Sequence, residues 1–137
     1  MAEIKKFEDI AAWQKARILS KAIYERSNLK PFNSDFDLKS QIRRSSGSVM
    51  DNIAEGFERG GRLEFIQFLS ISKASSAEVR SQLYRALDQN NITKQDFNEL
   101  YTLSEEISKM LSSFISYLNK TEVMGEKFKN RNKSTQN

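Results

Sequence analysis

The stretch SVMDNIAEGFERGGRLEF, residues 48–65, decides the fold because it contains both a helix end and a helix start. Val49 and Ile53 lie four residues apart, as they would on one face of a helix, and Gly60-Gly61 then interrupts the periodicity. A second periodic run begins near Leu63. Two helices joined by so short a link pack as antiparallel neighbours.

Four segments of the chain show the same helical periodicity, and short links join them. They are residues 7–27, the run from just after Ser34 to the Gly60-Gly61 break, residues 63–90 and residues 93–118. Ser34 with Asp37, and Thr93 with Asp96, have the spacing of side-chain caps at two helix starts. The sequence therefore predicts an all-α fold, an antiparallel up-down four-helix bundle over residues 1–120.

The composition excludes several kinds of chemistry. The 137 residues suit a single domain, and they include neither cysteine nor histidine. A thiolate site, a Ser-His pair and a histidine metal ligand are therefore impossible, and we expect no metal, no cofactor and no enzymatic activity. The chain shows no secretion signal and no apolar run long enough for a membrane span, which favours a cytoplasmic protein.

Most of the positive charge lies at the C-terminal end. The net charge is +4, and residues 120–137 contain five basic and two acidic residues. Helical periodicity is lost from Thr121 on, so residues 121–137 are predicted to form a polar, basic, disordered tail. Such a tail is either uninvolved in function or an arm that contacts nucleic acid. The charge balance alone is weak evidence for nucleic-acid binding.

A polar stripe runs beside the apolar face of the second predicted helix. Its members follow helical spacing and are Gln41, Ser45, Ser48, Asn52 and Glu55, ending near Gly56. We call these six residues the polar seam. Polar groups beside a core need hydrogen-bond partners, which either the small, serine-rich middle of residues 63–90 or a neighbouring subunit could supply. A catalytic role for Glu55 is disfavoured because no nucleophile, metal ligand or acid of another type accompanies it.

Six basic residues are candidates for contacts with phosphate groups. They are Arg43, Arg44, Arg59, Arg62, Lys73 and Arg80. The opposite interpretation is that nearby acids neutralise them, since Asp51, Glu58, Glu64 and Glu78 lie close in sequence. Spacing alone leaves both interpretations open. In residues 93–118, a second apolar row of Leu103, Met110 and Tyr117 indicates either deep burial or an oligomer contact.

Three motifs in order resemble those of a known family. SQIRRSSGSVMDNIAEGFERG resembles its hallmark run ending in Asn-Ile-Ala-Glu-Gly, here residues 52–56. FEDIAAWQKARILSKAIYE and RLEFIQFLSISKASSAEVRSQL resemble its first and third helices. The family is that of four-helix bundle proteins encoded in intervening sequences of 23S rRNA genes, related to the accessory variability proteins of diversity-generating retroelements. The resemblance covers residues 7–118.

The resemblance implies a homopentameric barrel in the bacterial cytoplasm, with no enzymatic activity. It also implies that basic surfaces bind rRNA or another structured nucleic acid, or serve a ribosome or reverse transcriptase as an accessory. Asp51 and Lys73–Ser76 depart from the family pattern, and Asp51 makes the local surface less basic. The leading prediction is a pentamer that binds RNA or DNA through phosphates. The alternative is a protein-interaction adaptor that has no direct contact with nucleic acid.

Overall fold

Four α helices form the protein. The computed structural model describes the backbone of residues 3–135 and the side chains of residues 3–121. The helices are α1 (Ala11–Ser27), α2 (Phe36–Glu58), α3 (Arg62–Asp88) and α4 (Lys94–Thr135), with short 3-10 helices η1 (Phe7–Asp9) and η2 (Phe32–Ser34). No strand occurs in the described residues. The prediction of an all-α fold with four helices is confirmed.

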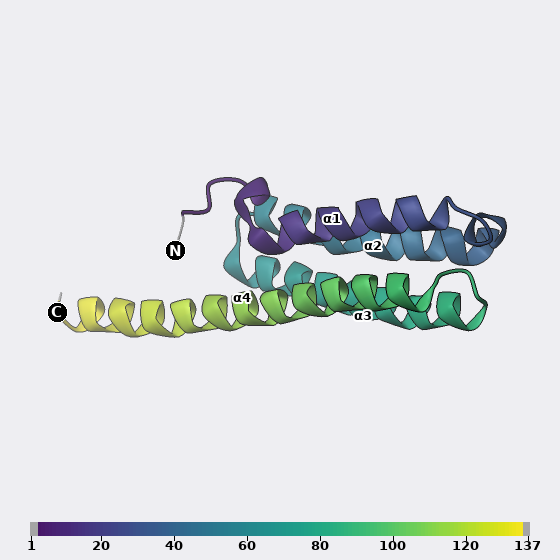
Figure 1. Ribbon diagram of the computed structural model, residues 1–137. Coiled ribbons are helices and arrows are strands. Elements are labelled where there is room, and N and C mark those ends of the chain that lie inside the picture. Colours follow the sequence, from purple (N-terminus) through teal and green to yellow (C-terminus); the bar gives the residue numbers. More distant parts are fainter. Residues whose placement is uncertain (1–2, 136–137) are drawn as a thin grey trace.

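Each helix packs against the next one in the chain, and α1 also packs against α4. In Figure 1, α1 and α2 lie together above α3 and α4, so that the helices surround one core. This is the up-down arrangement that the short links favour. The predicted pentamer concerns contacts between chains and stays a prediction.

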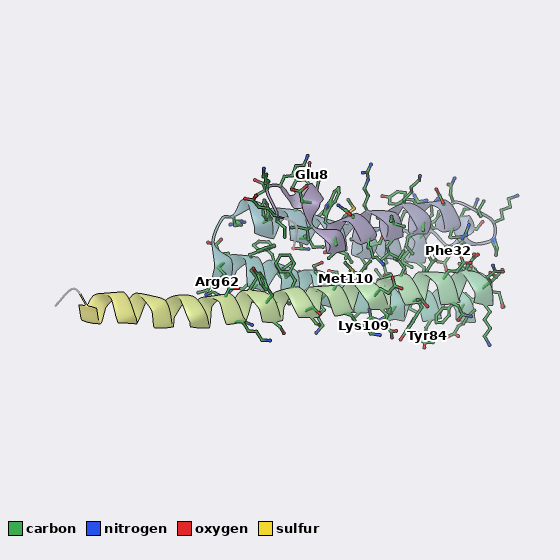
Figure 2. All side chains as sticks on the ribbon, turned by 60° about the vertical axis from the view of Figure 1, so that its left-hand side comes forward. Glu8, Phe32, Arg62, Tyr84, Lys109 and Met110 are labelled. Carbon is green, nitrogen blue, oxygen red and sulfur yellow. The ribbon has the colours of Figure 1, made fainter. Side chains whose placement is uncertain are left out.

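The core consists of the apolar stripes that the periodicity indicates. On α2 and α3, for example, Ile42, Val49, Leu69 and Leu83 are completely buried. The stripes of α1 and α4 face them, and the fully buried large side chains include Leu19, Ile23, Ile107 and Leu111. Figure 2 shows side chains filling the space between the helices. Burial of apolar surface is thus the main stabilising contribution.

Two helix starts differ from their predictions. The backbone at Ile10 is extended and separates η1 from α1, because Asp9 accepts hydrogen bonds from the amides of Lys5 and Lys6 while Ile10 turns into the core. Asp35, and not Ser34, caps α2, since its carboxylate accepts from the Leu38 amide at 3.3 Å. A predicted cap of α4 is confirmed by the hydrogen bond from the Asp96 amide to the Thr93 hydroxyl, 3.1 Å.

The fourth helix continues past the predicted domain boundary at residue 120. Its last turns extend beyond the ends of the other three helices in Figure 1. Among the residues whose side chains are described, Leu118 is the last one of α4 that packs against the core. The disorder predicted for residues 121–137 stays a prediction.

Candidate functional site

The centre of the polar seam lies against α3. Asn52 Nδ2 donates hydrogen bonds to the carbonyl and hydroxyl oxygens of Ser48, each at 2.8 Å. The Ser48 hydroxyl in turn lies 2.9 Å from the hydroxyl of Ser75 on α3. Asn52 therefore fixes the orientation of Ser48, and Ser48 joins the two helices. Within the chain, the neighbouring helix supplies the partner that half-buried polar groups need.

The rest of the seam also has partners within the chain. The Ser45 hydroxyl donates to the Gln41 carbonyl oxygen at 3.0 Å, and Arg85 of α3 donates to the Gln41 side-chain oxygen at 3.0 Å. Glu55 is exposed and accepts a charged hydrogen bond from Arg59 at 3.1 Å, one turn later on the same helix. None of these contacts places Glu55 near a nucleophile. Its position is that of a surface carboxylate in an i,i+4 ion pair.

Gly56 marks the closest approach of α2 and α3. A Cβ atom added at this position would lie 2.5 Å from Cβ of Phe68 and 3.1 Å from Cδ1 of Phe65. Carbon atoms in contact prefer about 3.5–4.0 Å. A side chain at this position therefore requires α3 to move away. The glycine of the Asn-Ile-Ala-Glu-Gly run is needed for helix packing.

Serine side chains connect α3 to both of its neighbours. The Ser72 hydroxyl donates to the Val49 carbonyl oxygen of α2 at 2.6 Å. The Ser76 hydroxyl lies 2.8 Å from that of Ser104 on α4, and each hydroxyl also reaches the other residue's carbonyl oxygen at 2.9 Å. All three serines are completely buried. The small middle of α3 therefore serves a close crossing of helices.

Arg80 points into the interface between α3 and α4 and is not free to contact a phosphate group. Its Nη1 atom donates to the Ser108 hydroxyl at 2.8 Å and lies 3.2 Å from the Ser104 hydroxyl. The guanidinium carbon also lies 6.0 Å from the centre of the Tyr101 ring. Lys73, seven residues earlier on α3, is exposed. Helical spacing places Lys73 and Arg80 in one row, but Lys73 faces solvent and Arg80 is bonded to α4.

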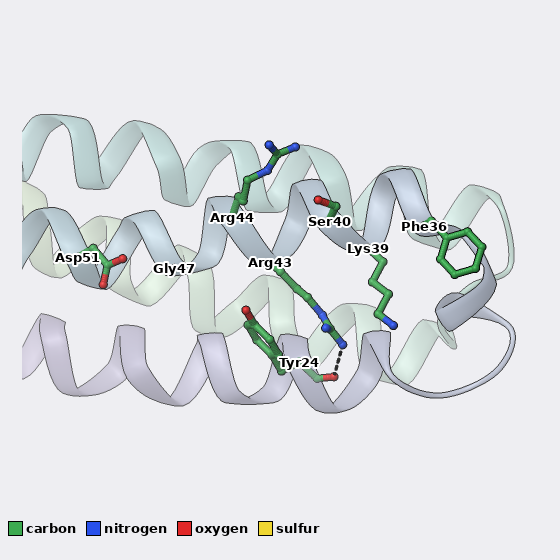
Figure 3. A pocket seen from close by; sticks show the side chains of 8 residues that line it. All are labelled: Tyr24, Phe36, Lys39, Ser40, Arg43, Arg44, Gly47 and Asp51. Carbon is green, nitrogen blue, oxygen red and sulfur yellow. Dashed lines mark hydrogen bonds between the residues drawn. The ribbon is translucent and has the colours of Figure 1, made fainter.

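Arg43 forms part of the contact between α1 and α2. Its Nε atom donates to the Ser27 hydroxyl at 2.9 Å, and its Nη2 atom donates to the Tyr24 carbonyl oxygen at 3.3 Å. The guanidinium carbon lies 4.3 Å from the centre of the Tyr24 ring (Figure 3). Arg43 thereby bonds one carbonyl oxygen and one hydroxyl group in the last turn of α1, while its side chain stays partly accessible.

Arg59 and Arg62 lie at the opposite end of α2, on either side of the Gly60-Gly61 turn that leads into α3. Arg59 pairs with Glu55 at 3.1 Å and with Glu64 at 3.9 Å, and it lies over the Phe68 ring. Arg62, labelled in Figure 2, donates to the Leu118 carbonyl oxygen of α4 at 3.4 Å. From Arg44 to Arg59 the helix rises by about 22 Å. The six candidate residues thus do not form one continuous surface.

A shallow groove along α2 does bring several basic side chains together. Its volume is about 550 Å³, and it is lined by Tyr24, Phe36, Lys39, Ser40, Arg43, Arg44, Gly47 and Asp51 (Figure 3). We call it the basic groove. It contains three cations and one carboxylate, and among the described residues Lys39 and Arg44 have no ion-pair or side-chain hydrogen-bond partner. Two rings are exposed, Tyr24 by 50% and Phe36 by 76%.

Sequence reasoning missed Lys39 and Phe36 in this groove. They precede Arg43 by four and seven residues, so helical spacing alone places all three on one face of α2. The adjacent Arg43-Arg44 pair is the more conspicuous basic feature of this segment. Arg44 points to the other side of α2, away from α1 and toward α3 (Figure 3).

Arg44 also lies at the rim of a second, smaller hollow between α2 and α3, with a volume of about 260 Å³. We call it the seam pocket, and its lining consists of Gln41, Arg44, Ser45, Ser48, Ser75, Glu78 and Gln82. Gln82 is only 4% exposed, and its side-chain oxygen has no hydrogen-bond partner in the described structure. Sequence reasoning did not select Gln82, because nothing in its spacing separates it from an ordinary helix residue.

A larger groove near the N-terminal end of α1 is mainly apolar. It has a volume of about 990 Å³, and its apolar lining is Ile4, Ile10, Ala11, Ala12, Phe57, Phe65, Met110, Phe114, Tyr117 and Leu118. Lys109, Glu3 and Asp9 lie at its edge (Lys109 and Met110 are labelled in Figure 2). We call it the apolar groove. Met110 and Tyr117 belong to the second apolar row predicted on α4, so that row is neither fully buried nor fully exposed.

Comparison with known proteins identifies the family. Residues 8–113 match the family described as 23S rRNA-intervening sequence protein. The chain belongs to this family. The match includes the polar seam, Gly56 and the serine-rich middle of α3, which are the features that join the helices. No curated protein matches the sequence.

A solved structure of the same type confirms the bundle of this 23S rRNA-intervening sequence family member. It is a protein of unknown function from the S23 ribosomal protein family of Bacteroides thetaiotaomicron VPI-5482. The two sequences are 25% identical, the similarity covers 77% of this chain and 95% of that one, and the TM-score is 0.71. The shared region therefore corresponds to nearly the whole of the solved protein.

Proposed function

We propose that this protein is a non-enzymatic nucleic-acid-binding protein whose contact surface is the basic groove on α2. The observation that carries the proposal is the presence of three cations and one carboxylate in one open groove, with Lys39 and Arg44 unpaired there. Surface cations are usually balanced by nearby acids, as Arg59 is by Glu55 and Glu64. Cations without such partners are available to phosphate oxygens.

Each groove residue has a distinct part in this proposal. Lys39 and Arg44 neutralise phosphates, and their release of counterions provides the binding free energy. Arg43 is held by Ser27 and Tyr24 and presents a fixed guanidinium group. The exposed Phe36 ring offers a face on which a base can stack. Binding of this kind depends on charge and shape and carries little sequence preference.

A salt titration of fluorescence anisotropy tests the proposal. The probes are a labelled single-stranded RNA of about 12 nucleotides and a duplex DNA of the same length, a size within the range that small domains cover. The logarithm of the affinity should fall with the logarithm of the salt concentration by about 0.7 to 0.9 per neutralised phosphate. The double substitution of Lys39 and Arg44 by alanine should lower this slope by about 2.

Lys73→Ala is the matched control, because Lys73 is an exposed, unpaired cation on α3 that does not line the basic groove. Its substitution should leave the slope nearly unchanged. If the wild-type protein bound neither probe at low salt, the nucleic-acid proposal would be wrong. If the salt dependence had the same slope for the wild type and the double variant, the contact surface would lie outside the basic groove.

The apolar groove supports a second proposal, that a further copy of this chain docks there and builds a homo-oligomer. Contiguous exposed apolar surface on a small protein marks an interaction site. Phe57, Phe114 and Leu118 are only partly buried by the single chain. The homopentamer that the family resemblance implies would cover such a surface. Met110→Lys should then reduce the mass measured by light scattering, and a wild-type mass equal to one chain would refute the proposal.

The two proposals are compatible because the grooves are formed by different residues. The partner that we propose, following the family resemblance, is a ribosomal RNA or a reverse transcriptase in the cytoplasm. In the described part of the chain, no cluster of acidic side chains could hold a metal ion. None of the described helices is long and apolar enough to cross a membrane. A protein-interaction adaptor without nucleic acid is the outcome if only the apolar groove binds a partner.

A further inference from the structure

The seam pocket contains an unused hydrogen-bonding group. Gln82 of α3 is 96% buried, and its side-chain oxygen has no partner. A buried polar atom without a hydrogen bond destabilises a fold, and in native proteins most such atoms are paired. The amide nitrogen of Gln82 also makes no hydrogen bond within the described structure. The oxygen is shielded from solvent within the fold and the amide nitrogen is not, so the nitrogen is the hydrogen-bond donor that Gln82 offers to the pocket.

The other lining residues define the shape and polarity of this pocket. Ser48 and Ser75 satisfy each other at 2.9 Å, and the Ser45 hydroxyl is taken by the Gln41 carbonyl oxygen. Their hydrogen bonds are made within the chain, so Gln82 is left as the group that selects a ligand. The volume of about 260 Å³ equals roughly nine water molecules of about 30 Å³ each. One planar ring system fits into such a space, whereas a base pair does not.

Charge at the rim connects this pocket with the basic groove. Arg44 lines both hollows and has no ion-pair partner among the described residues. A phosphate bound to Arg44 would hold an attached nucleotide directly at the mouth of the seam pocket. Glu78, also at the rim, is exposed and disfavours a ligand that places its negative charge on that side. The orientation of a bound nucleotide follows from these two side chains.

We infer that the seam pocket binds the base of an unpaired nucleotide, with the Gln82 amide on its edge and Arg44 on its phosphate. The amide nitrogen of Gln82 donates a hydrogen bond to an acceptor atom on the pairing edge of the base. Every nucleobase has an acceptor on this edge, but base pairing occupies it in a duplex, so unpaired strands are preferred. This inference rests on the proposed nucleic-acid binding at Arg44 and specifies the class of nucleic acid.

Anisotropy titrations with three probes test the inference. The probes are a labelled single-stranded RNA, the same strand annealed to its complement, and an abasic strand of equal length that keeps the phosphates. The wild-type protein should bind the single strand roughly fivefold or more tightly than the abasic strand, corresponding to one good base contact. Gln82→Leu removes the amide at similar volume and should abolish this preference while affinity for the abasic strand stays the same.

Gln67→Leu is the matched control, since Gln67 lies on the same helix but is exposed. It should keep the wild-type preference. Equal wild-type affinities for the single strand and the abasic strand would overturn the base-binding inference but leave phosphate binding intact. Lack of binding to all three probes would refute the proposed function itself. The wild-type comparison needs no variant, so it decides the matter even if Gln82→Leu does not fold.

Discussion

Replacement of Gly56 by alanine tests whether α2 and α3 are held at the close distance that the structure describes. The added methyl group would lie 2.5 Å from Cβ of Phe68, about 1 Å inside the preferred separation of two carbon atoms. Cβ of Phe68 is attached directly to the backbone of α3, so rotation of the phenylalanine ring cannot relieve the overlap. The two helices must separate locally, and the contacts around them weaken.

The expected cost follows from two opposing contributions. Overpacking of a core typically destabilises by about 1–3 kcal/mol, and a clash with a main-chain-attached atom belongs at the upper end. Alanine is a better helix former than glycine by about 1 kcal/mol, which offsets part of this cost. Gly56→Ala should therefore lower the free energy of unfolding by about 2 kcal/mol. For a domain of this size, the melting temperature should fall by about 8 °C.

Gly47 provides a control in the same helix. A Cβ atom at Gly47 would meet nothing within 4 Å, so Gly47→Ala gains helix propensity without a clash. It should raise the free energy of unfolding by about 0.5–1 kcal/mol. Urea unfolding followed by circular dichroism measures both variants. If Gly56→Ala were as stable as the wild type, or shifted in the same direction as Gly47→Ala, the close approach would be refuted.

Three further predictions concern single features of the fold. Asn52→Ala removes two hydrogen bonds to Ser48 and should lower the free energy of unfolding by about 1–2 kcal/mol, and an unchanged urea midpoint would contradict this role of the seam. Arg80 faces α4, so Arg80→Ala should lower the free energy of unfolding by about 2 kcal/mol. Its affinity for RNA should fall by no more than about twofold. A large loss of affinity would show that Arg80 belongs to the contact surface. Residues 121–137 should exchange amide hydrogens at nearly free-chain rates, and strong protection in mass spectrometry would show that they are ordered.

The helices and their buried stripes could be predicted because they depend on local spacing. A residue on the apolar face of a helix is buried wherever the partner helix lies, so Ile42, Val49 and Leu83 were identifiable from periodicity. The cap at Thr93 is equally local. The cap of α2 was assigned one residue too early because Ser34 and Asp35 are both good capping residues, and the choice depends on η2.

The direction of charged side chains could not be predicted in the same way. Lys73 and Arg80 occupy one row of α3, yet Arg80 finds three serine residues at the α3–α4 crossing and Lys73 finds none. Such a difference depends on where a distant segment passes. The same is true of Gln82, whose lack of a partner becomes visible only when α2 is in place. The site was therefore less predictable than the fold.

The buried serine contacts have a consequence for the axial register of the helices. Apolar seams that repeat every seven residues tolerate a slip of one repeat, about 10 Å along the axis, because leucines then meet other leucines. The bonds from Ser72 to Val49 and between Ser76 and Ser104 do not tolerate it, since a slipped helix would bury hydroxyl groups against side chains that cannot accept a hydrogen bond. The buried serines thus fix the axial register of this bundle, because they favour one alignment among several that bury equally apolar surfaces.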